Sequence, residues 1–136
     1  MISWELQPVT GAFVAANPFT EDVEAVRLEY LKFMSIVAEN PGVSLGMSGV
    51  VDKYWHEHIL YTQDYRNFCN RKVGYFVDHA PGSTPIGEEF LERYRRTIRL
   101  LSNKFGEVNT RIWPTVEDLE DGFCSGGNCG NSCSKD

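Results

Sequence analysis

The sequence predicts an all-α fold: a small bundle of four to five helices with an irregular N-terminal arm and a C-terminal tail rich in cysteine and glycine. Apolar residues recur at intervals of three and four in several stretches, which is the period of an amphipathic helix. No stretch alternates long enough for a secure strand, and the last fifteen residues hold almost nothing apolar to bury. A chain of 136 residues has the size of one ordinary domain. We therefore expect a helical domain over residues 1–121 and a tail over residues 122–136.

The first part of the chain is predicted to hold the arm and the first helix. Residues 1–16 show no sustained apolar period, so we expect no regular element there. Thr20 can cap a helix that continues to about Asn40, where the sequence Asn-Pro-Gly ends it. The apolar positions of this helix share one face: Val23, Val26, Tyr30, Phe33, Met34 and Val37.

Two shorter helices are expected in the middle of the chain. Ser48 can cap one that runs to about Tyr61, and Thr62 can cap another that ends before Gly74. The stretch GYFVDHAPGSTP, which follows, alternates too briefly for a strand, and its proline and glycine residues indicate a turn.

The last long helix is expected to start where Thr84 precedes Pro85 and to stop at Gly106. A short fifth helical turn is expected after Thr115. The apolar face of the long helix comprises Ile86, Phe90, Tyr94, Ile98, Leu101 and Phe105.

Composition and charge argue against several kinds of partner. The formal net charge is −6, and acidic residues gather near the end of the predicted domain, so a phosphate backbone would be repelled. No apolar run approaches the roughly 20 residues of a membrane-spanning helix, and the N-terminus lacks the regions of a cleaved signal. We expect a cytoplasmic protein that binds neither nucleic acid nor membranes.

Two of the three histidines, His56 and His58, lie on the same predicted helix. At the helical rotation per residue they point roughly 200° apart, so both cannot bind one ion while the helix stays regular. His58 falls among the apolar residues and is predicted to face the core, where a hydrogen-bonded histidine is the first interpretation and a ligand or catalytic group the alternative. Trp55 stands at the centre of the same apolar stripe, and we expect it to be buried.

Asp52 lies one helical turn before His56, a spacing that can offer two ligands to one metal. His79, in the loop that follows, is the candidate third ligand. Two histidines and one carboxylate suit iron or zinc with open coordination positions. An ordinary hydrogen bond between Asp52 and His56 is the alternative interpretation.

The cysteines suggest a second candidate metal site. Cys124, Cys129 and Cys133 stand as C-x4-C-x3-C in a segment without a core of its own. Three thiolates and one imidazole form a complete zinc shell, and Cu(I) also suits sulfur. The alternatives are a reduced tail without metal, or disulfides. Cys69 shares a helix face with aromatic residues and is interpreted as a small buried hydrophobe, with a fourth ligand as the alternative.

The sequence VDKYWHEHILYTQDYRNFC, followed by GYFVDHAP, resembles the glycine-rich domain-containing protein-like family. The pattern is D-x-x-W-H-x-H-x-L-x-x-x-x-Y, then a cysteine, a glycine and H-x-P. The resemblance implies that the Trp-His-x-His segment defines the domain, and it implies no reaction and no catalytic residue. The matching positions are Asp52, Trp55, His56, His58, Leu60, Tyr65, Cys69, Gly74, His79 and Pro81.

From these observations the sequence predicts a small helical metal-binding protein, with zinc as the default ion, held by the tail thiols with one histidine as an optional further ligand. The first alternative is a precursor whose folded domain presents the cysteine-rich tail to a modifying enzyme, and the second is a protein interaction module. No phosphate-binding glycine loop and no nucleophile elbow is present in the sequence, so no enzymatic reaction is predicted. An enzyme that uses the histidines as acid–base groups or iron ligands remains a further hypothesis.

Overall fold

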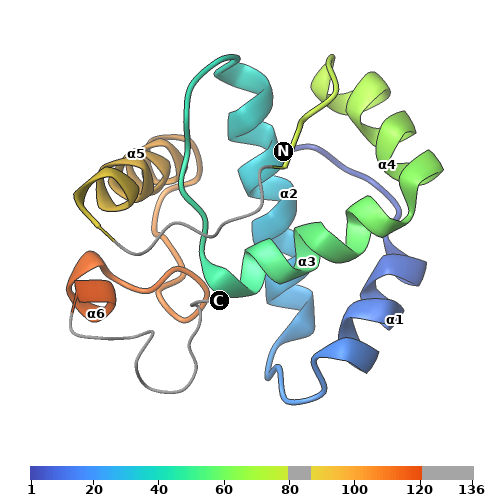
Figure 1. Cartoon of the computed structure of the whole chain (residues 1–136), viewed down its shortest axis with the longest axis horizontal. Helices are drawn as coiled ribbons and strands as arrows, with labels where there is room; N and C mark the ends of the chain where they lie inside the picture. Colours follow the sequence, from blue (N-terminus) through green and yellow to red (C-terminus); the bar gives the residue numbers. More distant parts are fainter. Residues whose placement is uncertain (80–86, 121–136) are drawn as a thin grey trace. The chain divides into compact units, whose positions relative to one another are not determined.

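The computed structural model of this chain describes residues 1–79 and 87–120 (Figure 1). These residues form six α-helices and one π-helix and no strand, which confirms the all-α prediction. None of the helices in this part of the chain has the length and apolar character needed to cross a membrane. The helices are α1 (Gln7–Ala16), α2 (Val23–Glu39), α3 (Gly49–Leu60), α4 (Thr62–Phe68), the π-helix η1 (Cys69–Val73), α5 (Glu88–Phe105) and α6 (Val116–Glu120).

Helix α1 lies where the sequence predicted an irregular arm. Pro8 occupies its first turn, where the missing N–H has no partner to lose, and Asn17 closes it by donating from Nδ2 to the carbonyl of Phe13 at 3.1 Å. Only Val9 and Phe13 of this helix are buried. Two buried positions do not make a recognisable period, so packing rather than local pattern stabilises α1.

The starts of the helices differ in detail from the prediction. The cap of α2 is the side chain of Asp22, not Thr20, and its Oδ1 accepts from the backbone N–H of Ala25 at 3.1 Å. Helix α4 does begin at Thr62, but Tyr61 occupies the cap position and no side chain caps the helix. These shifts are small because several residues near each start can satisfy the same exposed N–H groups.

The helix that begins at Thr62 changes its winding at Cys69, where α4 continues into η1. Gly74 ends it with φ 101°, and its N–H donates to the carbonyl of Cys69 at 2.8 Å, a bond five residues long. The predicted end before Gly74 is therefore confirmed. Left-handed φ explains why glycine stands there.

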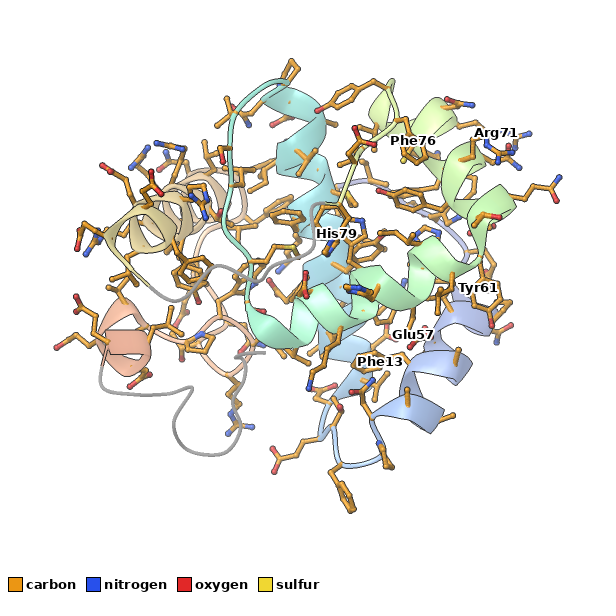
Figure 2. The ribbon with its side chains drawn as sticks, viewed as in Figure 1. Phe13, Glu57, Tyr61, Arg71, Phe76 and His79 are labelled. Atoms are coloured by element: carbon orange, nitrogen blue, oxygen red, sulfur yellow. The ribbon has the colours of Figure 1, made fainter. Side chains whose placement is uncertain are left out.

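The described chain divides into two compact units. The first comprises Met1–Val43 and Val50–Asp78, and its core is rich in aromatic rings. The ring of Phe13, which points from α1 toward α3 in Figure 2, lies 5.2 Å from the ring of Tyr54, and Tyr30 of α2 lies 5.1 Å from Tyr54 on its other side. These contacts pack α1, α2 and α3 together.

The second unit comprises Ser44–Gly49 and the chain from His79 onward. Its short first segment is hydrogen-bonded to α5, since the Gly46 N–H donates to the Arg93 carbonyl at 3.2 Å and the Thr97 hydroxyl donates to the Gly46 carbonyl at 2.8 Å. Helix α5 ends before Gly106 as predicted.

Helix α6 lies at the predicted short turn. Thr115 caps it by accepting from the Asp118 N–H at 3.1 Å. The long helix α5 begins at Glu88 with Gly87 at its cap position, so its predicted start at Thr84 and Pro85, which themselves lie outside the described residues, was too early. The tail over residues 122–136 lies outside them too, so the proposed boundary at residue 121 stays a prediction.

Candidate functional site

Helix α3 carries Asp52 and His56 one turn apart on its solvent side. The distance from Oδ2 of Asp52 to Nδ1 of His56 is 3.9 Å, and their side chains are 38% and 59% exposed. Both residues belong to the first unit. The regular i,i+4 geometry of the helix brings the carboxylate and the imidazole to the same place, as the sequence predicted.

His79 completes a group with these two residues. One ligand atom from each of Asp52, His56 and His79 can be chosen so that all three lie within 4.8 Å of one another. His79 directly follows Asp78, the last residue of the first unit, at the end of the segment that returns from η1 (Figure 2). The structure thus brings together the three side chains chosen from the sequence, while their role as ligands stays a prediction.

The three donors fit a borderline divalent ion. Imidazole nitrogen and carboxylate oxygen are both ligands of zinc, with bonds of roughly 2.0–2.2 Å, so two ligands of one ion are at most about 4.4 Å apart. The Asp52–His56 pair already meets this limit at 3.9 Å. The group as a whole lies within 4.8 Å, which is close to the spacing that one ion requires.

A buried hydrogen-bond chain connects α3 to the segment that carries His79. The indole N–H of Trp55 donates to the hydroxyl oxygen of Tyr65 at 3.0 Å, and this hydroxyl donates to the carbonyl oxygen of Val77 at 2.5 Å. Trp55 is 7% exposed, Tyr65 2% and Val77 8%. Trp55 immediately precedes His56 in the chain, and Val77 lies two residues before His79.

His58 is separate from this group and fully buried, as predicted from its place on the helix. Its Nδ1 lies 2.6 Å from the hydroxyl of Tyr30, and its Nε2 lies 2.8 Å from Oδ2 of Asp64. A carboxylate only accepts hydrogen bonds, so Nε2 carries the proton and Nδ1 accepts from Tyr30. Both ring nitrogens are therefore engaged, and the interpretation of His58 as a hydrogen-bonded core histidine is confirmed.

The charge state of this network follows from its burial. Loss of water lowers the pKa of His58, and the hydrogen bond and negative charge of Asp64 oppose that shift. Burial likewise raises the pKa of Tyr30 well above its usual range, so its hydroxyl keeps the proton that it donates. Asp64 also accepts the indole N–H of Trp4 at 3.0 Å. The imidazole of His58 is therefore uncharged at neutral pH, and the network is hydrogen-bonded to the N-terminal segment through Trp4.

The four cysteines have different outcomes. Cys69 is a fully buried free thiol, as expected for a small hydrophobe in the core. Cys124, Cys129 and Cys133 lie outside the described residues, so the thiol site predicted from their spacing stays a prediction.

Sequence reasoning missed the two partners of His58. Tyr30 was assigned to the apolar face of its helix, but the polar end of a buried tyrosine also needs a partner, and this was the available signal. Asp64 follows His58 by six residues across the junction between α3 and α4. No helical spacing predicts that contact, because it depends on the turn at Tyr61.

The fold and the site together define a small all-helical protein with a candidate group of two histidines and one carboxylate. A family model described as UCP032817-like matches residues 15–101. This match covers more than half of the 136 residues, and the chain belongs to the UCP032817-like family. None of the curated proteins and none of the solved structures compared with the chain matches it.

Proposed function

We propose that this chain is a small metal-binding protein that holds one divalent cation, zinc by default, at Asp52, His56 and His79. The observation that carries the proposal is the approach of one ligand atom from each residue to within 4.8 Å of the others. Two of these residues come from one turn of α3, and the third comes from a segment more than twenty residues away.

The donor set determines the chemistry of the proposed site. Three protein ligands leave at least one coordination position for water or another ligand, which distinguishes such a site from a closed structural zinc site with four protein ligands. The same set suits non-haem iron(II). Zinc stays the default because it accepts mixed nitrogen and oxygen ligands and needs no particular redox environment.

The tail thiols are the competing location. Cys124, Cys129 and Cys133 would bind zinc or copper(I) through sulfur, in a protein that we place in the cytoplasm. We also propose that the Trp-His-x-His segment relates this chain to the glycine-rich domain-containing protein-like family. A protein partner or modifying enzyme for the tail is likewise proposed from the sequence alone.

Metal content of protein purified without a histidine tag tests the proposal. Two variants separate the two locations: one replaces the three tail cysteines by serine, and the other is His56→Ala/His79→Ala. After incubation with zinc and removal of excess metal, the serine variant is expected to keep close to one zinc per chain. The histidine variant is expected to lose it.

A matched control comes from Glu57, which neighbours His56 in the chain but does not belong to the group (Figure 2). Glu57→Gln removes a nearby negative charge and should leave the zinc content unchanged. Asp52→Asn removes a ligand charge without changing shape and should weaken binding. Loss of zinc in the serine variant, with retention in the histidine variant, would assign the ion to the thiols and overturn the proposal.

A further inference from the structure

The hydroxyl of Tyr65 lies between the two parts of the chain that carry the proposed ligands. It accepts the Trp55 indole N–H at 3.0 Å and donates to the Val77 carbonyl at 2.5 Å. An indole only donates and a carbonyl only accepts, so the directions of both bonds are fixed. One hydroxyl group thus links Val77, in the segment 75–79, to Trp55 of α3 by two hydrogen bonds.

Packing holds the Tyr65 ring in this position. The ring meets the imidazole of His58 edge to face at 5.2 Å, and it meets the ring of Phe76 edge to face at 5.5 Å. Burial raises the pKa of the phenol, and the hydroxyl therefore keeps its proton throughout the neutral range. The donor to Val77 is consequently present at neutral pH.

The consequence for His79 follows from chain geometry. Residues 75–79 form no helix or strand, so regular backbone hydrogen bonds within the segment do not fix its course. Two residues span at most about 7 Å, and fixing Val77 therefore confines the backbone of His79. Trp55 fixes the other end of the link next to His56.

Resting on the metal site proposed above, we propose that Tyr65 is a positioning residue for the metal, which holds His79 at the distance from α3 that coordination requires. It touches no ion and acts through Val77. Partners that hydrogen-bond directly to a metal ligand typically contribute tenfold or more to metal affinity. Tyr65 acts one step further from its ligand, so the lower end of that range applies. The expected effect of Tyr65→Phe is therefore an about tenfold weaker zinc affinity.

The test measures zinc affinity by competition with a chromophoric chelator, in protein whose tail cysteines are serine. The variants are Tyr65→Phe, His79→Ala and the double variant. Tyr65→Phe should weaken zinc binding about tenfold alone and not at all in the His79→Ala background, because Tyr65 acts through His79. The visible spectrum of the cobalt(II)-substituted protein should shift in Tyr65→Phe toward that of His79→Ala.

Tyr94→Phe is the matched control. Tyr94 is fully buried, and its hydroxyl donates to the Pro114 carbonyl at 2.5 Å within the second unit. This variant loses the same kind of bond and should bind zinc like the parent. If zinc affinity falls equally in both tyrosine variants, a general loss of stability explains the effect of Tyr65→Phe, and the inference is overturned.

The remaining outcomes separate this inference from the proposed function. If His79→Ala lowers affinity but Tyr65→Phe does not, the site stands and the positioning role is wrong. If His79→Ala leaves affinity unchanged, the proposed site is wrong and the positioning role falls with it. Should Tyr65→Phe not unfold cooperatively, Trp55→Phe replaces it, since it removes the indole donor together with part of the ring and should also weaken binding. Unchanged binding would then overturn the inference.

Discussion

The hydrogen bonds of His58 allow the packing of the first unit to be tested by one substitution. His58→Leu should lower the free energy of unfolding by about 1–3 kcal/mol, because the buried hydroxyl of Tyr30 loses its acceptor. Asp64 adds little to this cost, since 43% of its side chain is exposed and water can replace the imidazole. Leucine and histidine have similar volumes, so repacking contributes less than the lost bond.

Tyr30→Phe is the matched second change, because it removes the hydroxyl that His58→Leu leaves without a partner. Alone it should cost about 1 kcal/mol, whereas in the His58→Leu background it should cost almost nothing, since two apolar groups then face each other. Urea denaturation of the four proteins, followed by circular dichroism, should give a coupling energy of about 1 kcal/mol. Strictly additive costs would refute the reasoning.

The same variant tests the pH dependence. Burial lowers the pKa of His58 from the ordinary value of 6.5, so the unfolded chain binds more protons than the folded chain as the pH falls below that value. This contribution to stability is complete above pH 6.5 and is lost as the pH drops through the lower folded pKa. His58→Leu should remove this part of the slope of stability against pH. An unchanged slope would show that another group carries it.

Three further predictions concern other positions. Trp55→Ala should lower the free energy of unfolding by about 3–5 kcal/mol because the indole is 7% exposed, and a urea midpoint close to the parent's would mark Trp55 as a surface residue. Gly46→Ala should lower Tm, because the added Cβ would lie 2.7 Å from the backbone nitrogen of Tyr94. Gly49→Ala is the control, since its Cβ would meet nothing within 4 Å, and equal changes in Tm for the two variants would contradict the prediction. Cys69 is fully buried, so in protein without tail thiols a thiol reagent should label it only as fast as the chain unfolds; rapid labelling of folded protein is the contrary result.

The helices could be predicted where the apolar period is long. The period of α2 predicts four residues of its buried face correctly, namely Val26, Tyr30, Phe33 and Met34. Helix α5 was predicted as a helix, but its buried face is Leu91, Tyr94, Thr97 and Leu101, so only Tyr94 and Leu101 of the predicted face are buried. In α1 only Val9 and Phe13 are buried, so the pattern was too short to predict a helix. The change of winding at Cys69 could not be predicted either, because the choice between α and π hydrogen bonds depends on packing rather than on local spacing.

The candidate metal site was likewise predictable from the sequence only in part. Asp52 and His56 could be paired from the sequence because one helical turn separates them. His79 could be chosen as the third candidate by its residue type, but its approach to the other two residues depends on tertiary structure that no local period encodes. Long-range contacts are therefore what the sequence left undetermined.

X-ray absorption at the zinc edge, on the chain of residues 1–136 loaded with one equivalent of zinc, tests the proposed metal site most directly. The account predicts a first shell of nitrogen and oxygen at roughly 2.0–2.2 Å, with the outer scattering of two imidazole rings from His56 and His79. A first shell dominated by sulfur at roughly 2.3 Å would contradict the account and assign the ion to the tail cysteines.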